Sequence, residues 1–159
     1  MHELSYRISQ VNDKANQFDK ILSSEQKGMI FFGSIRNFLL YFDKLNDYQE
    51  RERIIELIEF YFSQIEQNQF AYQISEKKEI SDNIIKPIAF YYIRDLDFKY
   101  HGGLKIYLFI ALHIDLILLL TGVLKKLYYV PVASLVFFVY WAYIKIFYAR
   151  KNKVYYFLW

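Results

Sequence analysis

Two long apolar runs near the C-terminus limit what this chain can fold into. They cover residues 105–124 and 129–149, with two lysines between them. About 20 apolar residues in a helix cross a hydrocarbon core of roughly 30 Å. Both runs are apolar nearly all round, whereas a helix that packs against one core has an apolar stripe on a single face. The pattern therefore favours a transmembrane helical hairpin over residues 104–149, rather than a buried hairpin of a soluble all-α protein.

The first hundred residues have the spacing of amphipathic helices. Apolar side chains recur every three or four positions, which places them on one face of a helix. This periodicity predicts helices over residues 1–23, 29–45, 48–70 and 75–92. The last of these should kink or restart at Pro87, because proline cannot donate a helical hydrogen bond. No stretch alternates apolar and polar residues convincingly, so no sheet is expected.

The fold class that follows is an all-α membrane protein. Residues 1–100 form a cytosolic bundle of about four helices, residues 104–149 the two-helix transmembrane hairpin, and residues 150–159 a short basic and aromatic tail at the membrane interface. Seven lysines and arginines lie near the two ends of the hairpin, and two lie in its turn. The positive-inside rule then places both termini in the cytoplasm, so we expect a multi-pass protein of the inner (cytoplasmic) membrane.

The distribution of charge and the missing motifs argue against several classes of function. Residues 1–100 carry 13 Lys and Arg against 16 Asp and Glu, a net charge of −3. Such a domain lacks the clustered basic surface that nucleic acid binding requires, so nucleic acid is not an expected partner. The chain has no cysteine and no motif of a phosphate loop, a zinc protease or a serine nucleophile. We therefore expect no metal, no cofactor and no enzyme site of those kinds.

Three polar side chains lie within the apolar runs. His113 and Asp115 are near the middle of the first run, and Tyr140 is in the second. Ionisable groups at that depth are costly, and they commonly serve a function. A hairpin folded about its two lysines would place Asp115 beside residues 138–140 and His113 beside residues 140–141. Two interpretations stay open: the polar groups line an ion path in a pore, or they brace the hairpin through hydrogen bonds to Tyr140.

The segment from Arg94 to His101 reads RDLDFKYH, an arginine and a histidine separated by six residues. This spacing, with a polar residue after the arginine, resembles the motif of HEPN ribonucleases, which also have an all-helical domain. The resemblance covers eight residues and the fold class. It implies that Arg94 and His101 of paired protomers cut RNA without a metal. The alternative is that both side chains meet lipid headgroups beside the membrane.

The architecture is also similar to that of small membrane proteins with a HEPN-like domain that accompany CRISPR and other anti-phage systems, some of which form pores. Three functional hypotheses follow. The first is an oligomeric membrane-embedded effector or pore-forming accessory of antiviral defence, whose cytosolic domain assembles or gates the membrane part. The second is a non-catalytic membrane anchor or adaptor that recruits a cytosolic protein partner. The third is a membrane-tethered HEPN-like ribonuclease. The lipid bilayer is a partner in all three, and the first requires a homo-oligomer.

Overall fold

The structure is a computed structural model that describes residues 2–67, 74–101, 104–127 and 129–156. It is mostly helical, which confirms the all-α prediction. The chain divides into two compact units. One contains the chain up to Phe98 together with the C-terminal segment from Lys153, and is called the helical domain below. The other covers Lys99–Asn152 and is called the hairpin.

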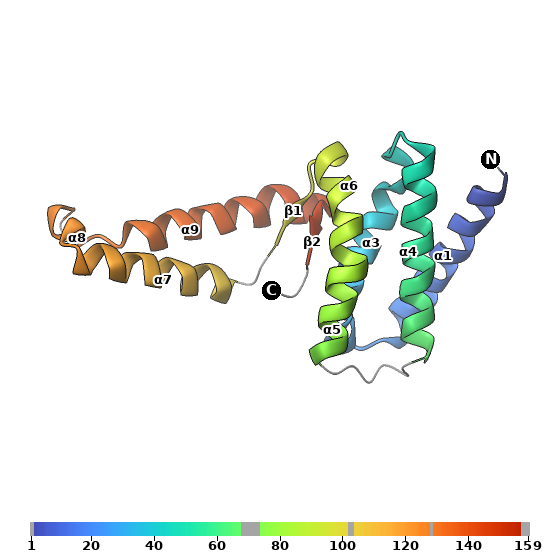
Figure 1. Ribbon diagram of the computed structural model, residues 1–159, viewed down its shortest axis with the longest axis horizontal. Coiled ribbons are helices and arrows are strands. Elements are labelled where there is room, and N and C mark those ends of the chain that lie inside the picture. The colour runs from blue at the N-terminus through green and yellow to red at the C-terminus, as the bar shows by residue number, and fades with distance from the viewer. Residues whose placement is uncertain (1, 68–73, 102–103, 128, 157–159) are drawn as a thin grey trace. The chain divides into compact units, whose positions relative to one another are not determined.

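The helical domain is built from the amphipathic segments that the sequence predicted (Figure 1). Its long helices are α1 and α4. Its C-terminal segment contains a short strand. The elements are α1 (His2–Ile21), α2 (Ser24–Met29), α3 (Phe32–Tyr41), the 3₁₀ turn η1 (Phe42–Lys44), α4 (Tyr48–Gln67), α5 (Ile74–Ile80), the π-helical turn η2 (Ser81–Ile85), α6 (Lys86–Leu96) and β2 (Val154–Tyr155).

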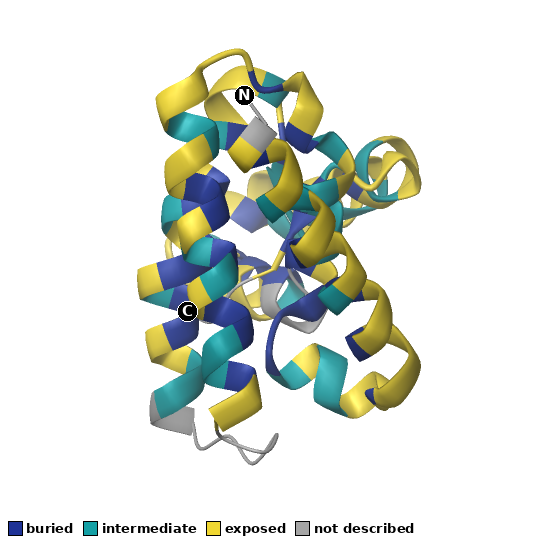
Figure 2. Ribbon diagram, turned by 90° about the vertical axis from the view of Figure 1, so that its right-hand side faces the viewer, coloured by how far each residue is buried: buried dark blue, intermediate teal, exposed yellow. Residues whose placement is uncertain are grey.

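The core of this domain lies along one face of each helix. In Figure 2, buried and exposed residues alternate along single helices, as amphipathic helices require. The predicted apolar stripe of α4 is buried completely, with no exposed area at Ile54, Ile58, Phe62 and Ile65. Burial of one such side chain contributes about 1.5–3 kcal/mol. The stripe therefore stabilises the domain mainly through contacts of α4 with α1, η2 and α6.

Aromatic rings fill the centre of the domain. Phe38 of α3 packs against Tyr92 of α6 with 4.7 Å between ring centroids, and against Phe98 at 5.7 Å. The buried hydroxyl of Tyr92 donates a hydrogen bond of 2.7 Å to the Phe38 carbonyl, and that of Tyr61 donates one of 2.9 Å to Ile30. These bonds satisfy polar groups that would otherwise be costly to bury.

Pro87 interrupts its helix as the sequence predicted. It lies in the first turn of α6, where its missing N–H costs least. The turn before it, Ser81–Ile85, is π-helical, and the Lys86 N–H donates to the Ser81 carbonyl. The helix thus widens by one residue and restarts at the proline.

The C-terminal segment packs into the helical domain. Val154 and Tyr155 are only 2% and 8% exposed. The Asn37 side-chain amide of α3 donates a hydrogen bond of 2.7 Å to the Val154 carbonyl. The Tyr156 N–H donates one of 2.7 Å to the hydroxyl of Ser34, which in turn donates to the Tyr156 carbonyl at 3.1 Å.

These contacts correct the prediction that residues 150–159 form a tail along the membrane interface. Residues 153–156 instead belong to the helical domain, because α3 offers polar side chains that bind their backbone. Composition alone suggested an interfacial anchor, but tyrosines are found both at membrane interfaces and in protein cores. Residues 157–159 of the predicted tail lie outside the described residues.

The hairpin consists of two main helices that run side by side (Figure 1). They are α7 (Leu104–Leu120) and α9 (Val132–Tyr143), and α9 continues through the π-helical turn η3 (Ile144–Tyr148) and the 3₁₀ turn η4 (Ala149–Lys151). A short helix, α8 (Val123–Lys126), lies in the connection, and strand β1 (Lys99–Tyr100) precedes α7. The sequence predicted no strand, and the two strands are only two residues long, too short to show an alternating pattern.

The two predicted spans differ in the structure. The described residues include one helix that is long and apolar enough to cross a membrane, Val132–Lys151, with 20 residues and a mean hydropathy of 1.6. The first predicted span is a shorter helix, since α7 has 17 residues. At 1.5 Å per residue its length is about 25 Å. The structure thus gives one candidate span and a shorter apolar helix beside it.

Candidate functional site

The polar groups of the hairpin gather where Asp115 meets the start of α9. Asp115 lies in the middle of α7 and is only 6% exposed. One carboxylate oxygen, Oδ1, accepts a hydrogen bond of 2.9 Å from the Ala133 N–H. The other, Oδ2, accepts one of 2.9 Å from the Ser134 N–H and one of 2.6 Å from the Ser134 hydroxyl. Three donors of α9 therefore converge on one carboxylate of α7.

This arrangement caps the N-terminus of α9. The first N–H groups of a helix have no partner inside the helix and carry partial positive charge. Pro131 occupies the N-cap position and makes no side-chain cap hydrogen bond. A helix usually takes its cap from a Ser, Thr, Asp or Asn that precedes it in the chain. Here the cap comes from Asp115 on the neighbouring helix.

The contacts of Asp115 bear on its two interpretations, the ion path and the brace. A pore-lining carboxylate would face a water path, whereas this one faces backbone N–H groups and is buried in the hairpin. Both oxygens already accept hydrogen bonds. Asp115 therefore has the contacts of a brace, and its place in an ion path stays a prediction. The expected bonding partner, Tyr140, is not the residue that the carboxylate contacts.

The register of the hairpin also differs from the expected one. Asp115 contacts Ala133 and Ser134, about one and a half helical turns nearer the start of α9 than residues 138–140. The prediction assumed a tight turn about the two lysines. In the structure the chain reverses through Gly122, at φ 74°, and the short helix α8 precedes the start of α9 at Val132. The longer connection shifts α9 along α7.

His113 and Tyr140 do not form a site together. His113 is exposed, and its Nδ1 lies 2.7 Å from the Phe109 carbonyl one turn earlier in α7. Its ring also packs on Phe109 with 4.3 Å between centroids. Tyr140 packs instead against Tyr107 of α7, edge to face at 6.2 Å. His113 therefore differs from Asp115 in facing outward from the hairpin.

Arg94 is held by two carboxylates. Its guanidinium contacts Glu50 of α4 at 2.6 Å and Asp95 at 2.6 Å. The hydrogen bonds to Asp95 and then to Glu50 raise the pKa of Arg94 above its usual range. The side chain is 48% exposed, and exposed ion pairs contribute little to stability. The guanidinium of Arg94 is therefore paired with Glu50 and Asp95.

His101 lies in the hairpin unit and packs on an aromatic ring. Its imidazole stacks on Trp141 with 6.4 Å between centroids. Lys145 also sits over the Trp141 ring, at 4.9 Å. Burial, and then the charge of Lys145, lower the pKa of His101 and favour its neutral form. Arg94 and His101 belong to different units and each has partners in its own unit, so their joint role in RNA cleavage stays a prediction.

Sequence reasoning missed Ser134 as the partner of Asp115. A signal was present: α9 begins after a proline in an apolar run, with no capping side chain of its own. Its free N–H groups must then find an acceptor elsewhere, and Asp115 is the one acid among residues 101–159. As for metals, the described residues contain no group of three or more His, Cys, Asp or Glu side chains that could hold an ion.

Comparison with protein-family models, with curated proteins and with solved structures found no match to this chain. Its function is therefore inferred from the geometry above.

The cap predicts a graded loss of stability at position 115. Asp115→Ala should lower the free energy of unfolding of the full chain in mild detergent by about 1–3 kcal/mol, because the α9 donors lose their acceptor. Asp115→Asn should cost roughly half as much, because its amide NH₂ would face an N–H donor while its oxygen still accepts. Denaturation followed by circular dichroism measures both.

Thr121→Val is the matched control, since the Thr121 hydroxyl bonds only to carbonyls of its own helix, at Ile117 and Leu118. It should change the free energy of unfolding by no more than about 0.5 kcal/mol. Equal stability of wild type, Asp115→Asn and Asp115→Ala would contradict the capping role.

Proposed function

We propose that this protein is a non-catalytic membrane anchor whose hairpin crosses the bilayer twice and holds the helical domain at the cytoplasmic surface. There the helical domain recruits a cytosolic protein partner. The observation that carries this proposal is the return of the chain after the hairpin to the domain from which it came.

That return constrains the number of membrane crossings. The chain before Lys99 and the segment after Asn152 belong to the same compact unit. A single crossing by Val132–Lys151 would place these two parts on opposite sides of the membrane. Asn37 and Ser34 bind the backbone of residues 154 and 156, so the two parts are on one side. An even number of crossings satisfies this constraint. We propose two crossings, one by each main helix of the hairpin, α7 and α9.

The outer surface of the hairpin supports burial in lipid rather than in protein. Only 11% of the most apolar 18-residue stretch of Val132–Lys151 is buried. Large apolar side chains are exposed along both helices, among them Leu112 and Leu116 of α7 and Val136 and Val139 of α9. A monomeric protein in water rarely exposes a contiguous apolar surface of this kind. Lipid chains would cover it without further protein.

Length and charge fit the same arrangement. A helix of 17 residues is at the short end of the range that spans a bilayer, and the bilayer adapts to it by thinning. Asp115 accepts hydrogen bonds from the first N–H groups of α9, which lipid would otherwise leave without a partner. Seven basic residues near the ends of the hairpin against two in its turn favour a cytoplasmic helical domain.

Charges placed on the outer face of the hairpin test the anchor. Val136→Lys with Val139→Lys should move much of the protein from the membrane fraction to the supernatant after carbonate extraction. Each lysine near the middle of a span costs about 2.5–3.5 kcal/mol.

Leu40→Lys with Phe90→Lys is the matched control, because these helical-domain side chains are as exposed as the two valines: 59% and 61% against 60% and 58%. The control should stay in the membrane fraction. Equal extraction of both double variants would contradict the anchor.

Self-association of the hairpin is a second candidate, favoured by His113. This side chain is exposed on α7, and its Nε2 has no partner among the described residues. An ionisable group at membrane depth usually faces protein or water rather than lipid. A second copy that packs against this face of α7 would supply a hydrogen bond to His113. The oligomeric effector or pore would require such an assembly.

The mass of the protein in several mild detergents distinguishes the two candidates. If His113 lies in an interface, light scattering should give a multiple of the 19.4 kDa chain mass, and His113→Ala should reduce it. Leu112→Ala, an exposed neighbour, serves as the control and should retain more of the assembly. A single-chain mass for wild type in every detergent would remove the oligomer and leave the anchor.

A further inference from the structure

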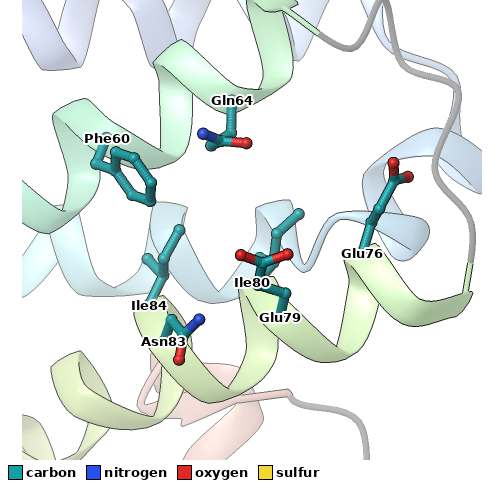
Figure 3. A pocket seen from close by; sticks show the side chains of 7 residues that line it. All are labelled: Phe60, Gln64, Glu76, Glu79, Ile80, Asn83 and Ile84. Atoms are coloured by element: carbon teal, nitrogen blue, oxygen red, sulfur yellow. The ribbon is translucent and has the colours of Figure 1, made fainter.

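A pocket in the helical domain lies between α4 and the segment formed by α5 and η2 (Figure 3). Phe60 and Gln64 project into it from α4. Ile80 and Ile84, which are 5% and 1% exposed, form an apolar floor. Its volume is about 240 Å³. Sites for drug-sized ligands have volumes of roughly 300–1,000 Å³, so this pocket suits a single side chain.

Three of the four polar side chains that line the pocket, all but Glu76, are available for a ligand. Within the described part of the chain, the side chains of Gln64, Glu79 and Asn83 have no hydrogen bond or ion pair. Some other acids of the domain are already paired, for example Glu59 with Arg7 and Glu66 with Lys14. The pocket thus combines a free carboxylate and two free amides.

The aromatic and apolar groups of the pocket complete its chemistry. Phe60 is 51% exposed, which leaves part of its ring accessible to a ligand. An aromatic face attracts a cation within about 6 Å of its centre. The isoleucine floor can hold the methylene stem of a long side chain whose charged head stays at the polar rim. Among the described residues, no lysine or arginine lines the pocket to compete for Glu79.

We propose that this pocket binds the side chain of an arginine or lysine from the protein that the helical domain recruits. The proposal rests on the proposed function, and it names the chemistry of the partner. The methylene stem lies on Ile80 and Ile84 beside Phe60, and the cationic head binds the Glu79 carboxylate and the Gln64 amide oxygen. Residues 1–100 have 16 acids against 13 basic residues, so the domain as a whole also attracts a basic segment.

The test uses the full chain in lipid nanodiscs, with ¹³C-labelled isoleucine methyl groups observed by NMR. The probe is N-acetyl-arginine amide, and the reference compound is N-acetyl-citrulline amide, which has a similar shape without the charge. The arginine compound should shift the Ile80 and Ile84 signals in a saturable way, and the citrulline compound should shift them much less. The Ile58 signal, from the core, reports that the fold is intact.

Two substitutions make the test specific. Glu79→Gln should weaken arginine binding by about five-fold or more, the loss expected for one charge-assisted hydrogen bond. Glu25→Gln removes the same charge from an exposed residue of α2 outside the pocket and should leave binding unchanged. Equal binding of arginine and citrulline, no effect of Glu79→Gln, or no shift in the wild type would overturn the proposal.

The same samples separate this proposal from the anchor. Insertion into nanodiscs without arginine binding would overturn the pocket proposal and leave the anchor intact. Arginine binding by a protein that stays outside the nanodiscs would support the pocket and contradict the anchor.

Discussion

The hydrogen bonds between α3 and the C-terminal segment are the constraint on which the rest of the structure depends. Asn37 and Ser34 bind the backbone of residues 154 and 156, and Val154 and Tyr155 are buried beside them. The chain therefore leaves the helical domain after Phe98 and returns to it at Lys153. The hairpin, Lys99–Asn152, is therefore an insertion that begins and ends at the helical domain. This return of the chain supports the proposed membrane hairpin over a single span.

Asp115 supplies the acceptor that the first N–H groups of α9 lack in their own helix. The connection between α7 and α9 places the start of α9 after a proline, where no preceding side chain accepts its N–H groups. In lipid, an unsatisfied backbone group costs several kcal/mol, because no water replaces the missing partner. The carboxylate of Asp115 offsets this cost and ties the two helices together. The residue that looked most like part of an ion path therefore has a structural role in the single chain.

The sequence predicted features that depend on local periodicity, and it failed where distant segments meet. The stripe of Ile54, Ile58 and Ile65 follows from 3.6-residue spacing, and the restart at Pro87 follows from a missing N–H. The contact of Asp115 with Ser134 depends on the length of the connection between α7 and α9, which periodicity does not report.

Two further features were beyond the sequence for the same reason. The tail was expected at the membrane because tyrosine and basic residues suit that place, but Ser34 and Asn37 of α3 bind its backbone. The pocket beside Glu79 exists only because α4 lies beside the segment formed by α5 and η2. Each depends on a neighbour that is far away in the chain.

The central claim is that α7 and α9 both lie in the bilayer, and spin labels test it directly. The chain has no cysteine, so single labels at Leu116→Cys in α7 and Val136→Cys in α9 have no background. In lipid vesicles, both labels should collide frequently with oxygen and rarely with a water-soluble nickel chelate, as measured by power-saturation EPR. A label at Leu40→Cys in the helical domain should show the reverse. Frequent nickel collisions at position 116 with few at position 136 would mean that α9 alone enters the membrane, and would contradict the two-pass hairpin.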